Sequence, residues 1–432
     1  MHPLAEELNS ILDKTAAGRL LSSFGRRIYF PKGIIAQSGE AKKQAHRANA
    51  TIGMAYKDGG PLMLKSIASF MPSFSPDEAV AYAPTAGLEE ARLAWKQEMV
   101  RKNPSINGDA ISLPAVIPGL TSGISYTADL FVDTDQAVLS AYPCWDNYAL
   151  VIEGRRGGVL KGVPFFVPGR GLDLDAIASG CKEAAKGGQL RVLFNFPQNP
   201  SGYTPSIGEG EALVNIIGEA ARGGADVLVM VDDAYFGLFY EDSLKESLFG
   251  RFAGLDERVL AVKIDGPTKE DYVWGFRMGF LTFGSRGMNV ETYGALEKKL
   301  MGTIRSSVSC VNTPAQSIML KTLADSETGK EKAACFRLMK RRYQAVRAFV
   351  DSRADHGILE ALPFNSGYFM SFLCKGISAE KLRRELLAVH GIGTVALGPY
   401  LRVAFSCLEE EQIPGIFETI YKSAGEIQVR GL

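Results

Sequence analysis

At residues 266–279 the chain reads Gly-Pro-Thr-Lys-Glu-Asp-Tyr-Val-Trp-Gly-Phe-Arg-Met-Gly, just after the apolar run Val259-Leu-Ala-Val-Lys-Ile264. The run predicts a strand, Lys269 follows its end, and Arg277 comes eight residues later among glycines. A lysine amine can condense with an aldehyde, an arginine fork can hold a phosphate, and glycine lets the backbone approach closely. Taken alone, a surface loop with ordinary charges accounts for the same residues. The rest of the chain decides between these two interpretations.

The composition is that of an ordinary globular protein. The 432 residues are 46% hydrophobic and 22% charged, and 48 lysines plus arginines balance 48 aspartates plus glutamates. Zero net charge argues against a nucleic-acid surface, which usually has a basic excess. The apolar runs are shorter than the roughly 20 residues of a membrane helix, and the charged start lacks the apolar core of a signal peptide. We therefore expect a cytoplasmic protein with no nucleic-acid or membrane partner.

The sequence lacks the motifs of several hydrolase classes. Its six cysteines form no CxxC pair, and its four histidines form no HExxH array, so no metal site is predicted. It also contains no GxSxG elbow and no GxxxxGK[ST] loop. Zinc hydrolases, serine hydrolases and nucleotide hydrolases are thereby disfavoured.

Between about residues 110 and 285, short apolar or β-branched runs alternate with longer amphipathic stretches. This pattern indicates parallel strands joined by helices, with both faces of the sheet covered. A helix is predicted over residues 208–222, where Gly223 and Gly224 end it. The predicted strands are residues 137–140, 191–195, 227–231, 259–264 and 279–283.

The C-terminal part has a mixed pattern, with helices predicted near residues 333–354 and 378–391 and strands at 367–373 and 401–405. We therefore predict an α/β protein with two domains. Residues 61–330 form a three-layer large domain around a mainly parallel sheet. Residues 1–60 and 331–432 form a smaller α+β domain.

Polar clusters follow four of the predicted strands. Ligands in open parallel sheets bind outside the carboxyl ends of the strands. Here those ends carry an aromatic stretch, an amide in a turn, a carboxylate next to a phenol, and the lysine. Pyridoxal phosphate requires such a set, because it has an aldehyde, a phosphate and a flat ring. The clusters are Tyr142-Pro-Cys-Trp-Asp-Asn-Tyr148, Phe196-Pro-Gln-Asn-Pro-Ser-Gly202, Asp232-Asp-Ala-Tyr235 and Lys269.

Asp232 is the candidate partner of the ring nitrogen, because it ends an apolar strand where its charge needs a partner. A helix N-cap is the structural alternative for Asp232. Asp233 is less favoured, since strand alternation turns it to the other face. Tyr235 and Asn199 can hydrogen-bond the ring hydroxyl, although core packing is the other interpretation of Tyr235.

The turn Pro118-Gly-Leu-Thr-Ser-Gly123 precedes a predicted helix that ends near Val132. Gly119, Leu120 and Thr121 can direct backbone N–H groups at a phosphate, because a helix N-terminus binds anions. A plain helix start is the alternative.

Taken in order, these motifs resemble the fold type I pyridoxal-phosphate enzymes, and in particular the class I aminotransferases that include aspartate and aromatic aminotransferases. The resemblance extends from about Asn49 to Phe405. It implies that Lys269 binds the cofactor and Arg277 its phosphate, and that Asn199, Asp232 and Tyr235 contact its ring. It also implies a homodimer with active sites at the subunit interface.

Further roles rest on this resemblance alone. Tyr82 is similar to a tyrosine that reaches the cofactor phosphate of the neighbouring subunit, and Trp145 to the aromatic residue that stacks on the ring. Arg402 resembles the arginine that holds the substrate α-carboxylate, near Asn199 and Trp145. Arg305 is similar to an arginine that binds a side-chain carboxylate in the aspartate-specific branch; a solvated charge is its alternative.

The chain departs from the family at one position. A serine that binds phosphate commonly stands three residues before the lysine, and this chain has Gly266 there. Thr268 is the candidate replacement for its hydroxyl.

The expected activity is transamination between an L-amino acid, acidic or aromatic, and a 2-oxo acid, with Lys269, Asp232 and Tyr235 as catalytic residues. A carbon–sulfur β-lyase shares the cofactor residues and is the first alternative. A pyridoxal-phosphate-binding regulator is the second; it is disfavoured because little chain precedes the predicted body and no basic excess is present.

Overall fold

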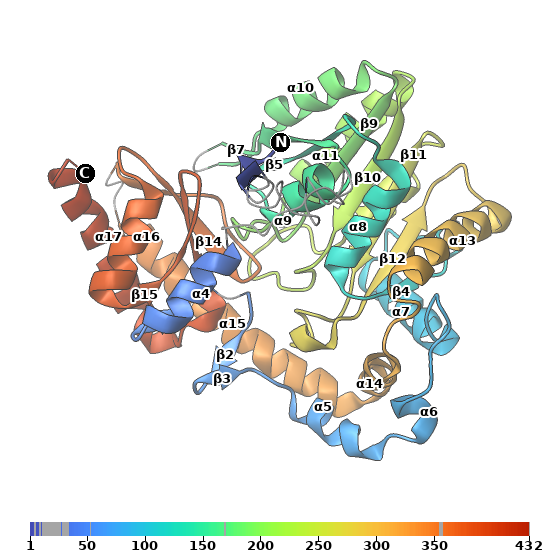
Figure 1. Cartoon of the computed structure of the whole chain (residues 1–432), viewed down its shortest axis with the longest axis horizontal. Helices are drawn as coiled ribbons and strands as arrows, with labels where there is room; N and C mark the ends of the chain where they lie inside the picture. Colours follow the sequence, from blue (N-terminus) through green and yellow to red (C-terminus); the bar gives the residue numbers. More distant parts are fainter. Residues whose placement is uncertain are drawn as a thin grey trace.

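The computed structural model describes residues 1–3, 6, 7, 10, 27, 34–51, 53–167, 170–353 and 357–431. A seven-stranded sheet forms the centre of the larger part (Figure 1). In spatial order its strands are β4 (Ala115–Ile117), β12 (Gly279–Gly284), β11 (Val259–Asp265), β10 (Asp226–Asp232), β9 (Gln189–Asn195), β5 (Ala137–Tyr142) and β6 (Val159–Pro164). The predicted α/β fold is therefore confirmed.

All five strands predicted between residues 110 and 285 are present, each longer by one or two residues. The interpretation of residues 279–283 as a parallel strand was wrong, because β12 is antiparallel to both β11 and β4. Residues 266–278, which connect β11 to β12, contain no α-helix, and a parallel return needs a crossover that is usually helical. Strands β4 and β6 were not predicted: β4 has three residues, and β6 is a largely exposed edge strand without an apolar run.

Helices cover both faces of this sheet and form the outer two layers. Strand β10 shows why, because its alternate residues enter different cores. Leu228 and Met230 pack in one core cluster, which includes residues of α8 (Leu120–Phe131) and α13 (Val290–Ser307). Val227, Val229 and Val231 pack in another, with α10 (Leu174–Ala185), α11 (Ile207–Arg222) and α12 (Phe249–Ala253). The predicted helix at 208–222 is α11.

The second part contains a four-stranded antiparallel sheet with the order β13 (Leu359–Ala361), β14 (Phe369–Cys374), β17 (Tyr400–Ala404) and β16 (Val395–Leu397). Helices α15 (Ser326–Asp351), α16 (Ala379–His390) and α17 (Ile413–Val429) accompany it (Figure 1). The predicted helices at 333–354 and 378–391 are α15 and α16, although residue 354 lies outside the described residues.

Part of the N-terminal segment contacts the C-terminal part. Strand β1 (Ala48–Asn49) pairs in parallel with β15 (Ile392–Gly393). Most of residues 1–33 lie outside the described residues, and the domain boundaries at 60 and 330 stay a prediction.

Within the described ranges no helix is long and apolar enough to cross a membrane.

The remaining elements are short or peripheral. These elements are α4 (Ile34–Gln44), β2 (Tyr56–Lys57), β3 (Gly60–Pro61), α5 (Lys65–Phe70), α6 (Pro76–Ala79), α7 (Glu89–Lys102), α9 (Asn147–Ala149), β7 (Phe166–Val167), β8 (Gly171–Leu172) and α14 (Thr313–Ala324), with a π-helical turn at Leu150–Arg155 and short 3-10 turns.

Two glycines let the backbone cross closely where β11 ends and β12 begins. A Cβ atom on Gly266 would lie 2.9 Å from the Cα of Gly279 and 3.3 Å from the carbonyl oxygen of Met278. Both neighbours are backbone atoms, so neither can move aside cheaply. Position 266 therefore has no room for a side chain.

We predict that Gly266→Ala destabilises the protein by about 1–3 kcal/mol, as overpacked sites do. The reason is the approach to Gly279, and thermal unfolding measures the effect. Gly275→Ala in the same loop is the control, because a Cβ there meets nothing within 4 Å. Equal melting temperatures for both variants would contradict the close packing.

Candidate active site

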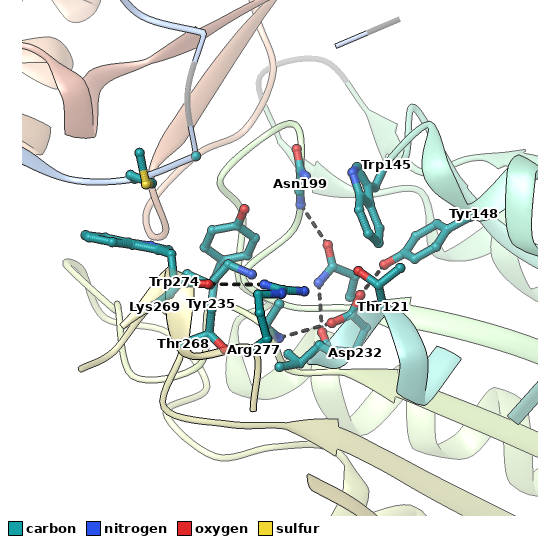
Figure 2. Close-up of a pocket in the computed structure, with 15 residues that line it drawn as sticks. Thr121, Trp145, Tyr148, Asn199, Asp232, Tyr235, Thr268, Lys269, Trp274 and Arg277 are labelled. Atoms are coloured by element: carbon teal, nitrogen blue, oxygen red, sulfur yellow. Dashed lines mark hydrogen bonds between the residues drawn. The ribbon is translucent and has the colours of Figure 1, made fainter. Parts of the chain in front are cut away.

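A cavity of about 270 Å³ lies at the carboxyl ends of β9, β10 and β11, where open α/β sheets bind ligands (Figure 2). It brings together most of the residues predicted from the sequence. The predicted residues that line it are Leu120, Thr121, Trp145, Asn199, Asp232, Tyr235, Lys269 and Arg277.

Asp232 is the buried anion of this cavity. Strand alternation turns it to the α8 side, as Leu228 and Met230 are turned. Its Oδ2 accepts a 2.6 Å hydrogen bond from the Tyr148 hydroxyl, and its Oδ1 accepts one from the backbone N–H of Ala234. Burial raises the pKa of the Asp232 carboxyl, while Tyr148 and then Lys269 oppose this rise. A cationic ligand group beside Asp232 would stabilise its charge further.

Lys269 extends from the β11–β12 loop into the same cavity. Its Nζ lies 5.0 Å from the centre of the Tyr235 ring, and its carbonyl oxygen accepts a hydrogen bond from the Tyr368 hydroxyl. Burial lowers the pKa of the Lys269 amine to about 8, and the nearby Asp232 carboxylate opposes this shift. A lysine with such a pKa has a larger neutral fraction near pH 7 and can act as a nucleophile or base.

Arg277 and the start of α8 form a cationic end of the cavity. Arg277 has a left-handed backbone, with φ of 52°, and its Nη1 donates to the carbonyl oxygen of Trp274. Gly119 has φ of +86°, and a Cβ there would lie 2.5 Å from Nη2 of Arg277. Glycine at 119 therefore lets the guanidinium lie against the N-terminus of α8, where backbone N–H groups attract anions.

Arg402 lies next to the cavity, behind Asn199. It is 2% exposed, its Nη1 donates to Oδ1 of Asn199 over 3.1 Å, and its Nη2 donates to the carbonyl oxygen of Thr51. The Phe369 ring lies 4.3 Å from the guanidinium carbon. Nε has no hydrogen-bond partner. An anion that contacts Nε would satisfy it.

Two predicted residues are not brought to the cavity of this chain. Tyr82 is 94% exposed, and Arg305 is exposed near the end of α13. Neither lines the cavity. Their proposed roles therefore require a second subunit.

Sequence reasoning did not assign several cavity residues. Tyr148 follows Trp145 by three residues, and this helical spacing was the available signal for its turn toward Asp232. Asn195 ends β9; its amide donates to the carbonyl oxygen of Asp232 and its Oδ1 accepts from the backbone N–H of Asn199. Met54 and Trp274 also line the cavity, and no local pattern singles them out.

The departure at Gly266 has a steric reason, because Gly279 occupies the space of a side chain. Thr268 is buried and lines the cavity, and its hydroxyl donates to the carbonyl oxygen of Met278 over a long 3.3 Å. That hydroxyl stays the candidate replacement for the family's serine.

We predict that the Lys269 amine titrates with a pKa of about 8. Asp232→Asn lowers this pKa by about one unit, because it removes the carboxylate that favours the charged amine. Acetylation of the ligand-free chain across pH, read residue by residue by mass spectrometry, measures both values. The exposed Lys330 controls for the reactivity of the reagent. A pKa of Lys269 near 10.5, its ordinary value, would contradict the buried environment.

Comparisons with known proteins agree with this geometry. The solved structure of an aminotransferase from Anaerococcus prevotii superimposes with a TM-score of 0.81 at 21% identity, covering 92% of this chain and 97% of that one. A multiple substrate aminotransferase from Thermococcus profundus gives 0.80 at 17% identity, covering 96% and 100%. At these identities the likeness shows the fold.

A curated relative, LL-diaminopimelate aminotransferase from Nitratidesulfovibrio vulgaris, is 26% identical over 195 residues. The match covers 43% of this chain, which spans about half the length of the curated relatives it matches. The family model for aminotransferase class I and II matches residues 56–420. This match covers most of the chain and confirms the predicted resemblance. The protein therefore belongs to the class I and II aminotransferase family.

Proposed function

We propose that the protein is a pyridoxal-phosphate-dependent aminotransferase, which moves an amino group between an L-amino acid and a 2-oxo acid. One observation carries the proposal: Lys269 and Asp232 face a single cavity that also has a cationic end at Arg277. Family membership implies the cofactor, and the cavity residues fit it.

The fit concerns each part of the cofactor. Arg277, Thr121 and the α8 N-terminus would hold the phosphate, since Gly119 leaves space for the guanidinium. Asp232 would pair with the ring nitrogen, and Trp145 would cover one ring face. When bound, pyridoxal phosphate supplies an aldehyde that receives the amino group and a ring that stabilises negative charge at the substrate α-carbon.

Lys269 has two tasks in this mechanism. It would hold the cofactor covalently, and once released its Nζ would take the proton from the substrate α-carbon and give that proton back later in the transfer. Its pKa of about 8 suits both directions of proton transfer near neutral pH. Asp232 would stay ionised beside a cationic ring nitrogen, and the Tyr148 hydrogen bond orients its carboxylate.

Arg402 would bind the substrate α-carboxylate. Its unpartnered Nε and its position beside Asn199 support a charge-assisted contact. Such a contact would fix the orientation of the Cα–H bond relative to Lys269, and so contribute to catalysis by positioning the substrate.

Two classes of amino donor have support. An acidic donor would use Arg305, which must come from a second subunit because it does not line its own cavity. An aromatic donor is supported by Met54 and Trp274, which add an apolar wall. A carbon–sulfur β-lyase would share the cofactor residues and differ in its substrate-side groups.

A test of the function measures amino-group transfer to 2-oxoglutarate or oxaloacetate from a panel of amino acids that includes aspartate, phenylalanine and LL-diaminopimelate. We expect transfer by the wild type and none by Lys269→Ala. Arg402→Ala lowers kcat/KM about 100-fold through lost positioning. Arg384→Ala, an exposed arginine of α16, is the matched control and retains activity. Cleavage of cystathionine without transfer to any 2-oxo acid would instead support the β-lyase.

Two variants separate the donor classes in the same assay. Arg305→Ala loses only acidic donors if Arg305 binds the side-chain carboxylate. Trp274→Ala loses only aromatic donors if the apolar wall selects them. Unchanged selectivity in either variant refutes the corresponding assignment.

We also propose a homodimer in which Tyr82 completes the site of the other subunit. Its 94% exposure in the single chain supports such a contact. Tyr82→Ala and Lys269→Ala are each expected to be strongly impaired. Mixing them creates hybrids with one intact site, so activity should return, as measured after subunit exchange. Mixtures no more active than the parents would argue against the shared site, provided that light scattering detects dimers.

A further inference from the structure

A buried lysine lies beneath the candidate active site and has no part in the mechanism above. Lys263 is on β11 and is 0% exposed. In the strand alternation it shares a face with Val259 and Ala261, which pack on the α11 and α12 side. It therefore points away from the cavity that contains Lys269.

Lys263 joins the ends of two strands through two carboxylates. Its Nζ contacts Oδ2 of Asp233, the residue directly after β10, and lies 3.1 Å from Oδ2 of Asp265, the last residue of β11. We call these three residues the buried triad. The Phe236 ring lies 5.1 Å from the Lys263 ammonium. The triad is thus centred on one cation with partners on both strands.

Neighbouring elements hold the carboxylates of the buried triad. The Ser247 hydroxyl donates to Oδ2 of Asp233 over 2.6 Å. The indole N–H of Trp95, on α7, donates to Oδ1 of Asp265 over 3.1 Å, and the Trp95 ring stacks on Phe280 of β12 at 4.6 Å. Two further segments of the chain therefore hold the triad: α7 through Trp95, and the segment that contains Ser247.

Other charged groups border the triad. A small cavity lies between the triad and other charged groups. It is lined by Asp233 and Asp265, by Glu98 and Lys102 of α7, and by Glu270 of the loop between β11 and β12. Lys102 bonds both carboxylate oxygens of Glu270 at 2.7 Å and lies 3.0 Å from Glu98. Since Glu270 directly follows Lys269, these ion pairs hold the far side of the loop whose start is held by Asp265.

We propose that Lys263 is a positioning residue of the active site: through Asp233 and Asp265 it locks the ends of β10 and β11 together, and so sets the placement of Asp232 relative to Lys269. Asp232 is the chain neighbour of Asp233 on the opposite face. The loop that carries Lys269 starts directly after Asp265. Movement of either strand end would change the separation of the two groups that the mechanism needs. The inference rests on the proposed roles of Asp232 and Lys269.

The charges of the triad also act on the site. Two carboxylates face one ammonium, so the ionised triad leaves one negative charge beneath the sheet. Burial raises the pKa of Asp233 to about 6, while Lys263 opposes the rise. The Lys263 ammonium also opposes the rise in the pKa of Asp232, so a charge of the triad favours the ionised form of the carboxylate in the cavity. Buried ion groups are weak evidence for stability, because apolar side chains often pack as well. A role in positioning the active-site residues would explain why this triad is ionic.

The main test is Asp233→Asn, which cuts the tie between the strands and leaves Lys263 paired with Asp265. We expect the pKa of the Lys269 amine in the ligand-free chain to fall, because the Asp232 carboxylate, which favours the charged amine, is no longer held in its place. With pyridoxal phosphate bound, the pH midpoint of the cofactor absorbance should shift the same way. We expect kcat to fall about 10-fold or more, with KM changed less, as for a misplaced group.

Asp226→Asn is the matched control, because Asp226 is an exposed aspartate at the other end of β10. A second variant removes all charge from the triad: Lys263→Met with Asp233→Asn and Asp265→Asn. It buries no unpaired charge, so it decides the question if the single variant does not fold. The proposal is overturned if either variant folds and keeps the wild-type pKa of Lys269, the wild-type pH midpoint of the cofactor absorbance and the wild-type kcat. If the wild type binds pyridoxal phosphate at Lys269 but transfers no amino group, the proposed function is refuted. The titration of Lys269 and that of the cofactor absorbance still test the positioning role of Lys263.

Discussion

The alternation of side chains at the end of β10 is the constraint on which the site depends. Consecutive strand residues point to opposite faces, so Asp232 enters the cavity while Asp233 enters the buried triad. Each carboxylate is almost fully buried and would lose hydration without compensation. Asp232 accepts hydrogen bonds from the Tyr148 hydroxyl and the Ala234 N–H. Asp233 pairs with the Lys263 ammonium and accepts a hydrogen bond from the Ser247 hydroxyl. Two adjacent charges can therefore be buried at one strand end because the sheet separates their partners.

The reversal of β12 is the second structural requirement. Because β12 runs antiparallel to β11, the connecting loop stays at the carboxyl end of the sheet and returns immediately. Lys269 and Arg277 lie on the two limbs of that loop and reach the same cavity. The close crossing of Gly266 and Gly279 makes the return possible but excludes a side chain at position 266. The phosphate-binding hydroxyl common in the family is thus absent here for a steric reason, and Thr268 is the hydroxyl that remains at the cavity wall.

Local pattern brought three predicted residues to one cavity, and their roles stay a prediction. Asp232 and Lys269 come at or after the ends of apolar strands and Arg277 precedes one, so all three lie at the same edge of the sheet. The direction of β12 could not be read, because a strand's pattern is the same in either orientation. Tyr148 and Trp274 line the cavity because of tertiary packing. In the sequence, Lys263 is one polar residue within an apolar run, and no local pattern indicates that it is buried. Tyr82 and Arg305 raise a different problem: a single chain leaves both exposed, so neither sequence pattern nor this fold places them at a site.

The charges around the cavity explain what kind of molecule it can hold. Lys269, Arg277 and Arg402 are cationic groups, and Asp232 is the anion that lines the cavity beside them. An anionic ligand would balance this excess, and the cations stand at different places: Arg277 by the α8 N-terminus, Arg402 behind Asn199. A phosphate at the first and a carboxylate at the second would each meet an arginine fork, which suits planar or bidentate anions. Lys269 lies beside Tyr235, where burial weakens its proton affinity. In the proposed function the two arginines bind anions and the lysine exchanges protons. Arg402 is also buried, so the difference lies in the side chains: a guanidinium keeps its proton, whereas burial lowers the pKa of the Lys269 amine to about 8.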